Sequence, residues 1–284
     1  MPQQPIRPAA VAGSWYPGSA DTLRRQVQRY LDGAALSLRG DVRAVIAPHA
    51  GLIYSGPVGA FAYATLAGRR YDAIVLVGPS HYVAFEGVAV VAHGAFDMPG
   101  GPMAIDERSA GELLHAGEVV SERPAAHSRE HSLEMQLPFL AQVLPATPIV
   151  PLVMGHQTRE TVTGLAGALA TTFRGRNVLF VASSDLSHYH DAATASELDG
   201  RVVQFIQRFD AEGLLDAIER FPEHACGGGP IVSVMLAARE LGARDARVLR
   251  YADSGDVSGD KSAVVGYVAA ALGTFDVSRG EQAN

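Results

Sequence analysis

The amino-acid sequence predicts a single α/β domain, built as a layered sandwich around a central, mostly buried sheet. Short apolar runs rich in β-branched residues alternate with helical patterns, and no linker-like segment divides the 284 residues. Several of these runs are apolar throughout, which is typical of strands buried on both faces of a mixed or parallel sheet. Strands that alternate with helices give layered α/β domains.

The expected strands are seven short apolar segments. They are Val42–Ala47, Ala73–Val77, Val88–Val91, Ile149–Met154, Val178–Ala182, Val248–Tyr251 and Ala263–Ala270. The expected helices lie between them. They are Ala20–Leu31, Gly56–Leu66, Asp106–His115, Ser132–Val143, Glu160–Phe173, Glu197–Phe209, Glu212–Arg220 and Pro230–Leu241. Pro138 is expected to kink its helix, because a proline removes a backbone hydrogen bond and clashes with the preceding turn.

Composition and charge argue against several classes of partner. The net charge is -7 and the arginines are scattered, whereas nucleic-acid phosphates require clustered Lys and Arg. No segment approaches the roughly 20 apolar residues of a membrane-spanning helix. Residues Met1–Pro8 lack the apolar stretch of a secretory signal. The single cysteine, Cys226, excludes an intrachain disulfide, so we expect a reducing, cytoplasmic location.

Histidines follow the first, second, fourth and fifth of the expected strands. They are His49, His81, His156 and His188. Ligand sites in open α/β sheets form beyond the carboxyl ends of the strands, so histidines after parallel neighbours would converge on one crevice. His49 and His81 both lie in tight turns that contain proline. A glycine-rich run follows His49, where a ligand could approach the backbone closely.

The other histidines are predicted to lie at the surface. His156 belongs to an ordinary turn into a helix, although a strand precedes it. Five more histidines have no supporting context, which leaves them as polar surface residues. They are His93, His115, His127, His190 and His224.

Cys226 precedes three consecutive glycines and a helix that is expected to begin near Pro230. A thiol beside a helix N-terminus has a lowered pKa, so we expect thiolate, the form that binds metals, near neutral pH. A free cysteine is more often a small buried hydrophobe. Because three glycines would make a poor core wall, we favour a functional thiol.

Two polar clusters supply candidate acid–base groups. Asp185 and His188 follow the fifth expected strand, where they could orient each other or form an acid–base pair. Asp185 could also cap a turn, and the two roles are compatible. His131 and Glu134 lie three residues apart on one helical face and could act together. Glu134 could instead only complement the positive end of the helix, and the residues leave these alternatives open.

Six motifs, in order along the chain, resemble those of the Memo-like family. Its bacterial and archaeal members are called AmmeMemoRadiSam system protein B. The motifs are Ala12–Pro17, Pro48–Gly56, Gly78–His81, His131–Pro138, Ser183–His188 and Cys226–Gly227. The match runs from about Arg7 to Leu272, which is nearly the whole of the predicted domain at residues 1–284.

The resemblance implies a fold similar to that of class III extradiol dioxygenases, an α/β sandwich around a central sheet. It also implies that His49, His81 and Cys226 bind a metal ion. The family's metal is reported as iron or copper, and its chemical activity is not settled.

Three further residues match pocket positions of the family, and we take them as candidate catalytic groups. They are His131, Asp185 and His188. Prokaryotic members look like companions of an AMMECR-type protein and a radical S-adenosylmethionine protein. The resemblance therefore implies both as partners. We also expect a small-molecule or peptide ligand in the pocket.

One difference from extradiol dioxygenases concerns the third ligand. Those enzymes hold Fe(II) with two histidines and one carboxylate, and Cys226 would replace the carboxylate. Two imidazoles and a thiolate form a softer set that suits Cu(I), zinc or thiolate-bound iron. We therefore do not expect ring cleavage to accompany the fold.

Two functional hypotheses follow. One is a metal-dependent oxidoreductase with a dioxygenase-like fold. The other is a non-catalytic module that binds a metal or a peptide. A metal site with open coordination positions would favour catalysis, and a closed site would favour binding.

Overall fold

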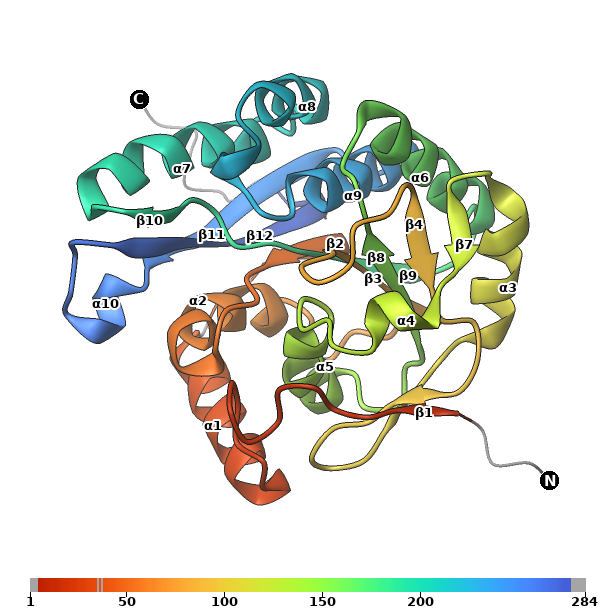
Figure 1. The fold of residues 1–284 in the computed structure, drawn as a ribbon, viewed down its shortest axis with the longest axis horizontal. Helices are drawn as coiled ribbons and strands as arrows, with labels where there is room; N and C mark the ends of the chain where they lie inside the picture. Colours follow the sequence, from red (N-terminus) through yellow and green to blue (C-terminus); the bar gives the residue numbers. More distant parts are fainter. Residues whose placement is uncertain (1–4, 35, 37, 277–284) are drawn as a thin grey trace.

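The computed structural model describes residues 5–34, 36 and 38–276, which form three layers (Figure 1). The middle layer is a nine-stranded sheet in the order β10-β12-β2-β9-β3-β8-β4-β7, with β11 also paired to β12. Its strands are β2 (Gly40–Ala47), β3 (Ala73–Pro79), β4 (Val88–Val90), β7 (Val120–Glu122), β8 (Ile149–Met154), β9 (Val178–Ser183), β10 (His188–His190), β11 (Asp245–Asp253) and β12 (Val264–Phe275). The predicted α/β sandwich is therefore confirmed.

Helices cover both faces of the sheet (Figure 1). One face carries α1 (Ala20–Gly33), α2 (Leu52–Ala64) and α5 (Leu137–Val143). The other carries α6 (Arg159–Thr172), α7 (Ala192–Gln207), α8 (Ala211–Arg220) and α9 (Gly228–Glu240). The short helices are α3 (Glu107–Ala116), α4 (Pro124–His127) and α10 (Gly255–Ser258), with 3-10 turns η1 (Glu134–Gln136) and η2 (Pro222–His224).

The centre of the sheet is parallel and apolar. Strands β2, β9, β3 and β8 run side by side in the same direction. Every residue of β3, β8 and β9 is buried, as their continuous apolar sequences predict. Register places Ala47 beside Ser183, and Pro79 beside Met154. The carboxyl ends of four strands therefore share one edge of the sheet, where a site can form.

The sheet is mixed rather than wholly parallel. β12 runs antiparallel to β2, β10 and β11, and β4 runs antiparallel to β8. β12 also extends to Phe275, five residues beyond the expected end at Ala270. The extension pairs with β2 on one side and β11 on the other, so backbone pairing carries the strand past its most apolar part.

Pro138 does not kink a helix, so that prediction is wrong. The η1 turn ends at Gln136, and α5 begins at Leu137 with Pro138 in its first turn. The N–H groups in the first turn of a helix have no partner within the helix, so the N–H that proline lacks is not missed there. The fixed φ of proline also favours the helical conformation. The proline therefore starts a helix.

The N-terminal segment is anchored by a small sheet and a buried ion pair. Strands β1 (Ile6–Arg7), β5 (Ala95–Phe96) and β6 (Met103–Ala104) form this second sheet. Arg7 pairs with the fully buried Glu134, which also accepts hydrogen bonds from Tyr16 Oη and the Val11 N–H. The first four and last eight residues of the predicted domain lie outside the described residues.

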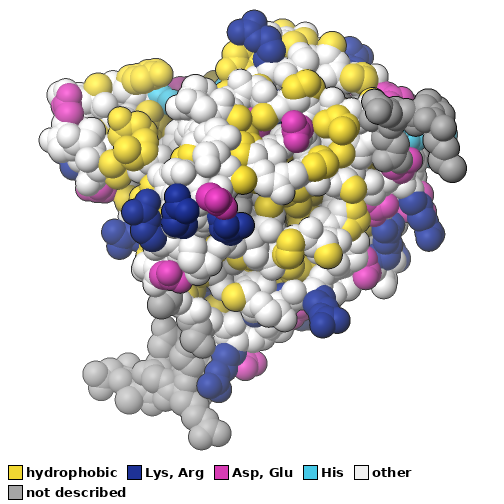
Figure 2. Space-filling view, turned by 90° about the horizontal axis from the view of Figure 1, so that it is seen from below, with side chains coloured by type: hydrophobic (Ala, Val, Ile, Leu, Met, Phe, Trp, Pro, Cys, Tyr) yellow, Lys and Arg dark blue, Asp and Glu magenta, His cyan; other side chains and the backbone are white. Residues whose placement is uncertain are grey.

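The surface has a mixed charge pattern on the face that Figure 2 shows. Arg side chains stand in small groups with Asp and Glu side chains among them, over a background of scattered apolar side chains. Interspersed charges of both signs are typical of a solvated surface. In the described part of the chain, no helix is long and apolar enough to cross a membrane.

Candidate metal centre

Three side chains from distant parts of the sequence meet beyond the carboxyl edge of the sheet. His49 follows β2, His81 follows β3, and Cys226 precedes α9. One donor atom from each lies within 4.8 Å of the others. His49 Nε2 lies 3.2 Å from Cys226 Sγ. Two imidazole nitrogens and one sulfur at these separations are a donor set that suits a single transition-metal ion.

A buried hydrogen-bond network orients the His49 ring. The Ser183 hydroxyl donates to the Ser132 carbonyl at 2.7 Å and accepts from Gln136 Nε2 at 2.7 Å. Its only proton is therefore used, so His49 Nδ1, at 2.8 Å, must be the donor to the Ser183 Oγ. This fixes the tautomer of His49 and leaves an unprotonated Nε2 facing Cys226.

Tyr63 fixes the orientation of Gln136 in this network. Gln136 Nε2 faces the Pro48 carbonyl at 3.1 Å, and a carbonyl can only accept. Gln136 Oε1 consequently faces the Tyr63 hydroxyl, which donates to it at 2.5 Å. Both Tyr63 and Gln136 are buried, so the network is sealed from water. Burial, with a smaller contribution from the charge of His81, lowers the pKa of His49 and keeps the ring neutral.

Glu130 orients the His81 ring. One carboxylate oxygen lies 2.8 Å from His81 Nδ1, and the other accepts the His81 N–H at 2.6 Å. The Ser132 N–H also donates to Glu130 at 2.9 Å. Burial alone would raise the pKa of Glu130, but these hydrogen bonds and the charge of His81 lower it to about 2. Glu130 is therefore an anion, and Nε2 is the ring nitrogen of His81 left for a ligand.

Two loops hold Cys226 in place. The Cys226 N–H donates to the Asp185 carbonyl at 3.2 Å, and the Asp185 N–H donates to Cys226 Sγ at 3.3 Å. Gln157 accepts the Gly229 N–H and donates to the Cys226 carbonyl, each at 2.7 Å. A Cβ at Gly227 would meet the Ser183 carbonyl oxygen at 2.4 Å, so only glycine allows this approach.

Two expectations about Cys226 are wrong. Burial, followed by the charge of Asp185, raises the pKa of the thiol rather than lowering it, because these effects exceed that of the nearby helix N-terminus. The three glycines are also buried core. Gly228 packs against Ile218 and Gly229 against Met154, at distances that leave no room for a Cβ. A metal cation beside the sulfur would favour thiolate again.

His131 stands beside the trio rather than within it. Its ring stacks on His81 with centroids 4.4 Å apart and lies 4.3 Å from the Trp15 ring. The Tyr82 hydroxyl lies 3.3 Å from His131 Nδ1. Burial, then the charges of His49 and His81, lower the pKa of His131 to about 3. The ring is therefore neutral at physiological pH.

Glu134 is not the partner of His131. Arg7 and Tyr16 bind its carboxylate, as described above, so the suggested pairing of His131 with Glu134 is wrong. The carboxylate near His131 is Glu130, whose Oε1 lies 3.7 Å from His131 Nδ1. Glu130, which directly precedes His131, lies on the side of the metal centre because residues 128–133 are not helical.

Asp185 links two of the site loops through backbone hydrogen bonds. Its Oδ1 accepts the N–H groups of His49 at 2.7 Å and Ala50 at 3.3 Å. Burial raises the pKa of Asp185 to about 6, against the opposing effects of these bonds and of the His188 charge. His188 begins β10 and is half-buried. Among the described residues, no hydrogen bond joins Asp185 to His188.

The prediction that the remaining histidines lie at the surface is only partly correct. His93, His115 and His156 are exposed, and His190 is half-buried. His127 and His224 are buried, contrary to the prediction. His127 Nε2 lies 3.1 Å from the Ala89 carbonyl under β4, so tertiary packing supplied the context that the local sequence lacked.

Sequence reasoning missed the residues that orient the ligands. Glu130, Ser183 and Gln136 hold the two imidazoles, and none of them is among the predicted site residues. Ser183 and Gln136 lie within the family motifs, and Glu130 directly precedes His131. The signal that identifies Glu130 is its position directly before His131, at the start of a motif.

The fold and the meeting point of these loops define an α/β protein with a candidate His/His/Cys centre at the strand ends. Residues 7–271 match the family described as Memo-like protein. The chain belongs to this Memo-like family.

Curated relatives agree over almost the full length. A MEMO1 family protein of Methanosarcina mazei is 38% identical over 267 residues, which cover 93% of this chain and 98% of the relative. One from Nitrosopumilus maritimus is 32% identical over 268 residues, covering 92% and 98%. An uncharacterized Escherichia coli K12 protein of known structure shares the fold, with a TM-score of 0.54 and 15% identity over 82% of this chain and all of that one.

Proposed function

We propose that this chain is a metalloprotein in which His49, His81 and Cys226 hold a redox-active ion, iron or copper, with zinc as a competing occupant. The observation that carries the proposal is the orientation of the two imidazoles. Both Nδ1 atoms are engaged by protein groups, and His49 Nε2 lies 3.2 Å from Cys226 Sγ. Metal-binding histidines are held in this manner by partners on the other ring nitrogen.

Exposure favours a catalytic role over storage of the ion. The His81 side chain is 28% exposed, whereas His49 is 1% exposed. An ion held between them would have one protected side and one side open to an incoming molecule. Open coordination positions are typical of catalytic rather than structural metal sites.

In this proposal, His131, Asp185 and His188 are the acid–base groups around the ion. Asp185 has a pKa of about 6, close to the range in which a carboxyl group can exchange a proton at neutral pH. His131 is neutral and stacked on His81, so it can accept a hydrogen bond from a bound molecule. The bound ion would supply electron transfer or polarisation of the ligand.

The first test is elemental analysis of protein purified without added metal. We expect about one ion of iron or copper per chain in the wild type, and strong depletion in the His49→Ala and Cys226→Ser variants. Circular dichroism of the variants separates loss of metal from loss of fold. Wild-type protein that remains metal-free after incubation with each ion would end the proposal.

The second test concerns ring cleavage. Wild-type protein loaded with Fe(II) should open simple catechols far more slowly than about 1 per second, a typical lower bound for enzymes. The Cys226→Asp variant restores two histidines and one carboxylate and is the informative comparison. Cleavage by the wild type at enzyme-like rates would show that the thiol does not set the chemistry.

A second candidate function is a peptide-binding module, and one observation favours it. Large apolar side chains that follow the site residues are exposed, among them Ile53 at 56%, Tyr82 at 47% and Tyr189 at 80%. Exposed apolar side chains of this kind suit an apolar ligand. Co-purification with the AMMECR-type and radical S-adenosylmethionine proteins, with and without metal, would test the proposed partners.

A further inference from the structure

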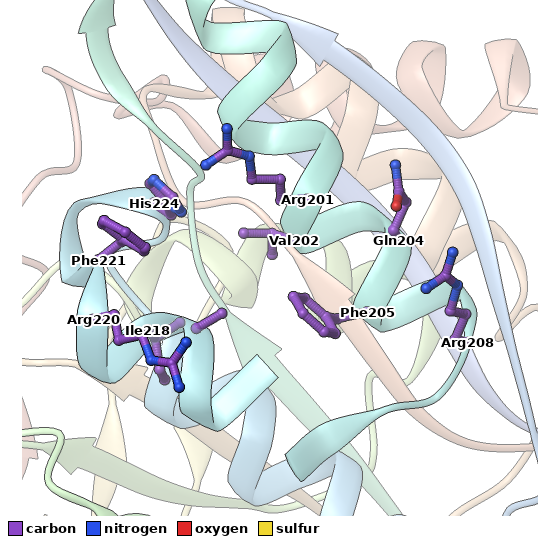
Figure 3. Close-up of a pocket in the computed structure, with 10 residues that line it drawn as sticks. Arg201, Val202, Gln204, Phe205, Arg208, Ile218, Arg220, Phe221 and His224 are labelled. Atoms are coloured by element: carbon purple, nitrogen blue, oxygen red, sulfur yellow. The ribbon is translucent and has the colours of Figure 1, made fainter. Parts of the chain in front are cut away.

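A concave site lies between α7 and α8, in the helical layer outside the sheet (Figure 3). The cavity has a volume of about 270 Å³. Its lining comes from α7, α8 and the η2 turn, and it includes none of the residues of the candidate metal centre. The lining divides into an apolar floor and a cationic rim.

The floor of this pocket is apolar and partly exposed. Val202 and Ile218 are buried beneath it, and Phe205 is half-buried. Phe221 is 46% exposed and stacks on His224 with ring centroids 5.2 Å apart. An aromatic ring that stays exposed while its other face is packed offers a surface for a second apolar group.

The rim carries three arginines without anionic partners. Arg201 lies on α7, Arg208 directly follows the end of this helix seven residues later, and Arg220 ends α8. Figure 3 shows Arg201 on α7 and Arg208 just past its end, on either side of Val202 and Phe205. Within the described residues, none of the three guanidinium groups makes a hydrogen bond or an ion pair.

Three carboxylates on α8 pair with arginines outside the pocket. Asp216 and Glu219 pair with Arg159, and Glu212 pairs with Arg239. These acidic residues are not part of the pocket lining. These three carboxylates therefore do not neutralise the rim cations, and an anion in the pocket would supply the counter-charge.

Glu223, beside His224, does not neutralise the rim either. Glu223 Oε1 lies 4.0 Å from His224 Nε2, and the Glu223 side chain is 59% exposed. It is not among the residues that line the cavity. The pocket consequently keeps a net positive lining in a chain whose formal charge is -7.

We propose that this pocket binds a small organic anion. Its phosphate or carboxylate head pairs with Arg201, Arg208 or Arg220, and its apolar body rests on Phe205 and Phe221. Guanidinium groups bind such heads through paired, charge-assisted hydrogen bonds. The volume is slightly below the roughly 300 Å³ at which drug-sized pockets begin, so the body must be short.

The proposal is tested with hexyl phosphate as the probe, by calorimetric titration of the full chain. Inorganic phosphate supplies the head alone, and 1-hexanol supplies the tail alone. We expect saturable binding of hexyl phosphate that is at least about tenfold tighter than that of either part, because head and body bind together. Equal affinity for inorganic phosphate would overturn the role of the apolar floor.

Charge-neutralising variants locate the site. The triple variant Arg201→Gln, Arg208→Gln, Arg220→Gln should bind hexyl phosphate about tenfold or more weakly, at least the loss expected for one charge-assisted hydrogen bond. Arg174→Gln removes an exposed arginine outside the pocket and should bind as the wild type does. Equal affinities of the triple variant and the Arg174→Gln control would overturn the proposal.

A membrane lipid could present the same phosphate head and apolar body. Sedimentation with phosphatidylcholine vesicles, with and without phosphatidic acid, distinguishes this source. A soluble ligand predicts binding of free hexyl phosphate and no sedimentation with either vesicle. Sedimentation that requires phosphatidic acid, without binding of the free probe, would replace the small anion with a lipid surface.

Discussion

His49 and His81 each engage a protein group through Nδ1 and leave Nε2 for a ligand, but they are held by opposite kinds of partner. His49 donates from Nδ1 to the neutral Ser183 hydroxyl, which Gln136 supports in turn. His81 is held through Nδ1 by the ionised Glu130. His49 is 1% exposed, whereas the side chain of His81 is 28% exposed.

This contrast shows that the two histidines are oriented by different means, a neutral network on the buried side and an anion on the exposed side. The hydroxyl–amide network of His49 adds no charge to a sealed wall, where an unpaired charge would be costly. Glu130 adds one negative charge on the side that faces solvent and makes His81 a more basic ligand. Together with the Cys226 thiolate, Glu130 would balance the charge of a divalent ion. The predictions below test this division.

The largest effect on metal binding is expected at Cys226, the proposed third ligand beside the two histidines. Cys226→Ser should weaken metal binding by about 100-fold or more, because a neutral hydroxyl is a poor ligand for soft ions. Isothermal titration with Cu(I) or Zn²⁺ in competition with a chelator measures this change. Ser128→Ala, at an exposed serine, is the control. A variant that binds as tightly as the wild type would show that Cys226 is not a ligand.

The next effect tests the charged side. Glu130→Gln removes the anion beside His81 and should weaken metal binding by about 10- to 100-fold, the range seen when such supporting groups are lost. Glu86→Gln removes the same charge from an exposed residue of the β3–β4 loop and should leave affinity unchanged. Equal behaviour of the two variants would contradict the role of Glu130.

A smaller effect is expected on the neutral side. Ser183→Ala removes one hydrogen bond to His49, worth about 1 kcal/mol, so metal binding should weaken roughly fivefold. The nitrogen chemical shifts of the His49 ring should also show loss of the fixed tautomer. If Ser183→Ala costs more than Glu130→Gln, the comparison between the two sides must be reversed.

His127 is a buried histidine outside the proposed ligand set, so it tests the effect of burial on a histidine pKa without metal binding. Burial lowers its pKa from 6.5 to about 4, and its Nε2–H donates to the Ala89 carbonyl. A lowered folded-state pKa stabilises the fold above pH 6.5, and this contribution is lost as pH falls toward 4. The loss amounts to about 3 kcal/mol. Metal affinity at neutral pH should not change in His127→Gln, which makes this the smallest effect on the site.

The measurement is the free energy of unfolding of wild type and His127→Gln, by urea titration from pH 7 to pH 4. The stability of the wild type should fall more steeply than that of the variant. His115→Gln, at an exposed histidine, should follow the wild-type curve. Parallel curves for His127→Gln and the wild type would contradict the assigned burial penalty.

Much of the fold was determined by the sequence. The continuous apolar runs of β3, β8 and β9 predicted strands buried on both faces, because only apolar side chains can fill both sides of a central sheet. The position of His49 and His81 directly after such strands predicted that they share an edge. Those inferences need only local patterns and the geometry of parallel strands.

Other features were decided by tertiary structure. The sequence could not show that Glu130 and Ser183 orient the two histidines, since the bond from Ser183 to His49 spans 134 residues. It predicted a lowered thiol pKa for Cys226 from a local helix, and burial reversed the sign. A pKa, a tautomer and the burial of His127 depend on groups brought close only by folding, because electrostatic and hydrogen-bond energies follow distance in space and not along the chain.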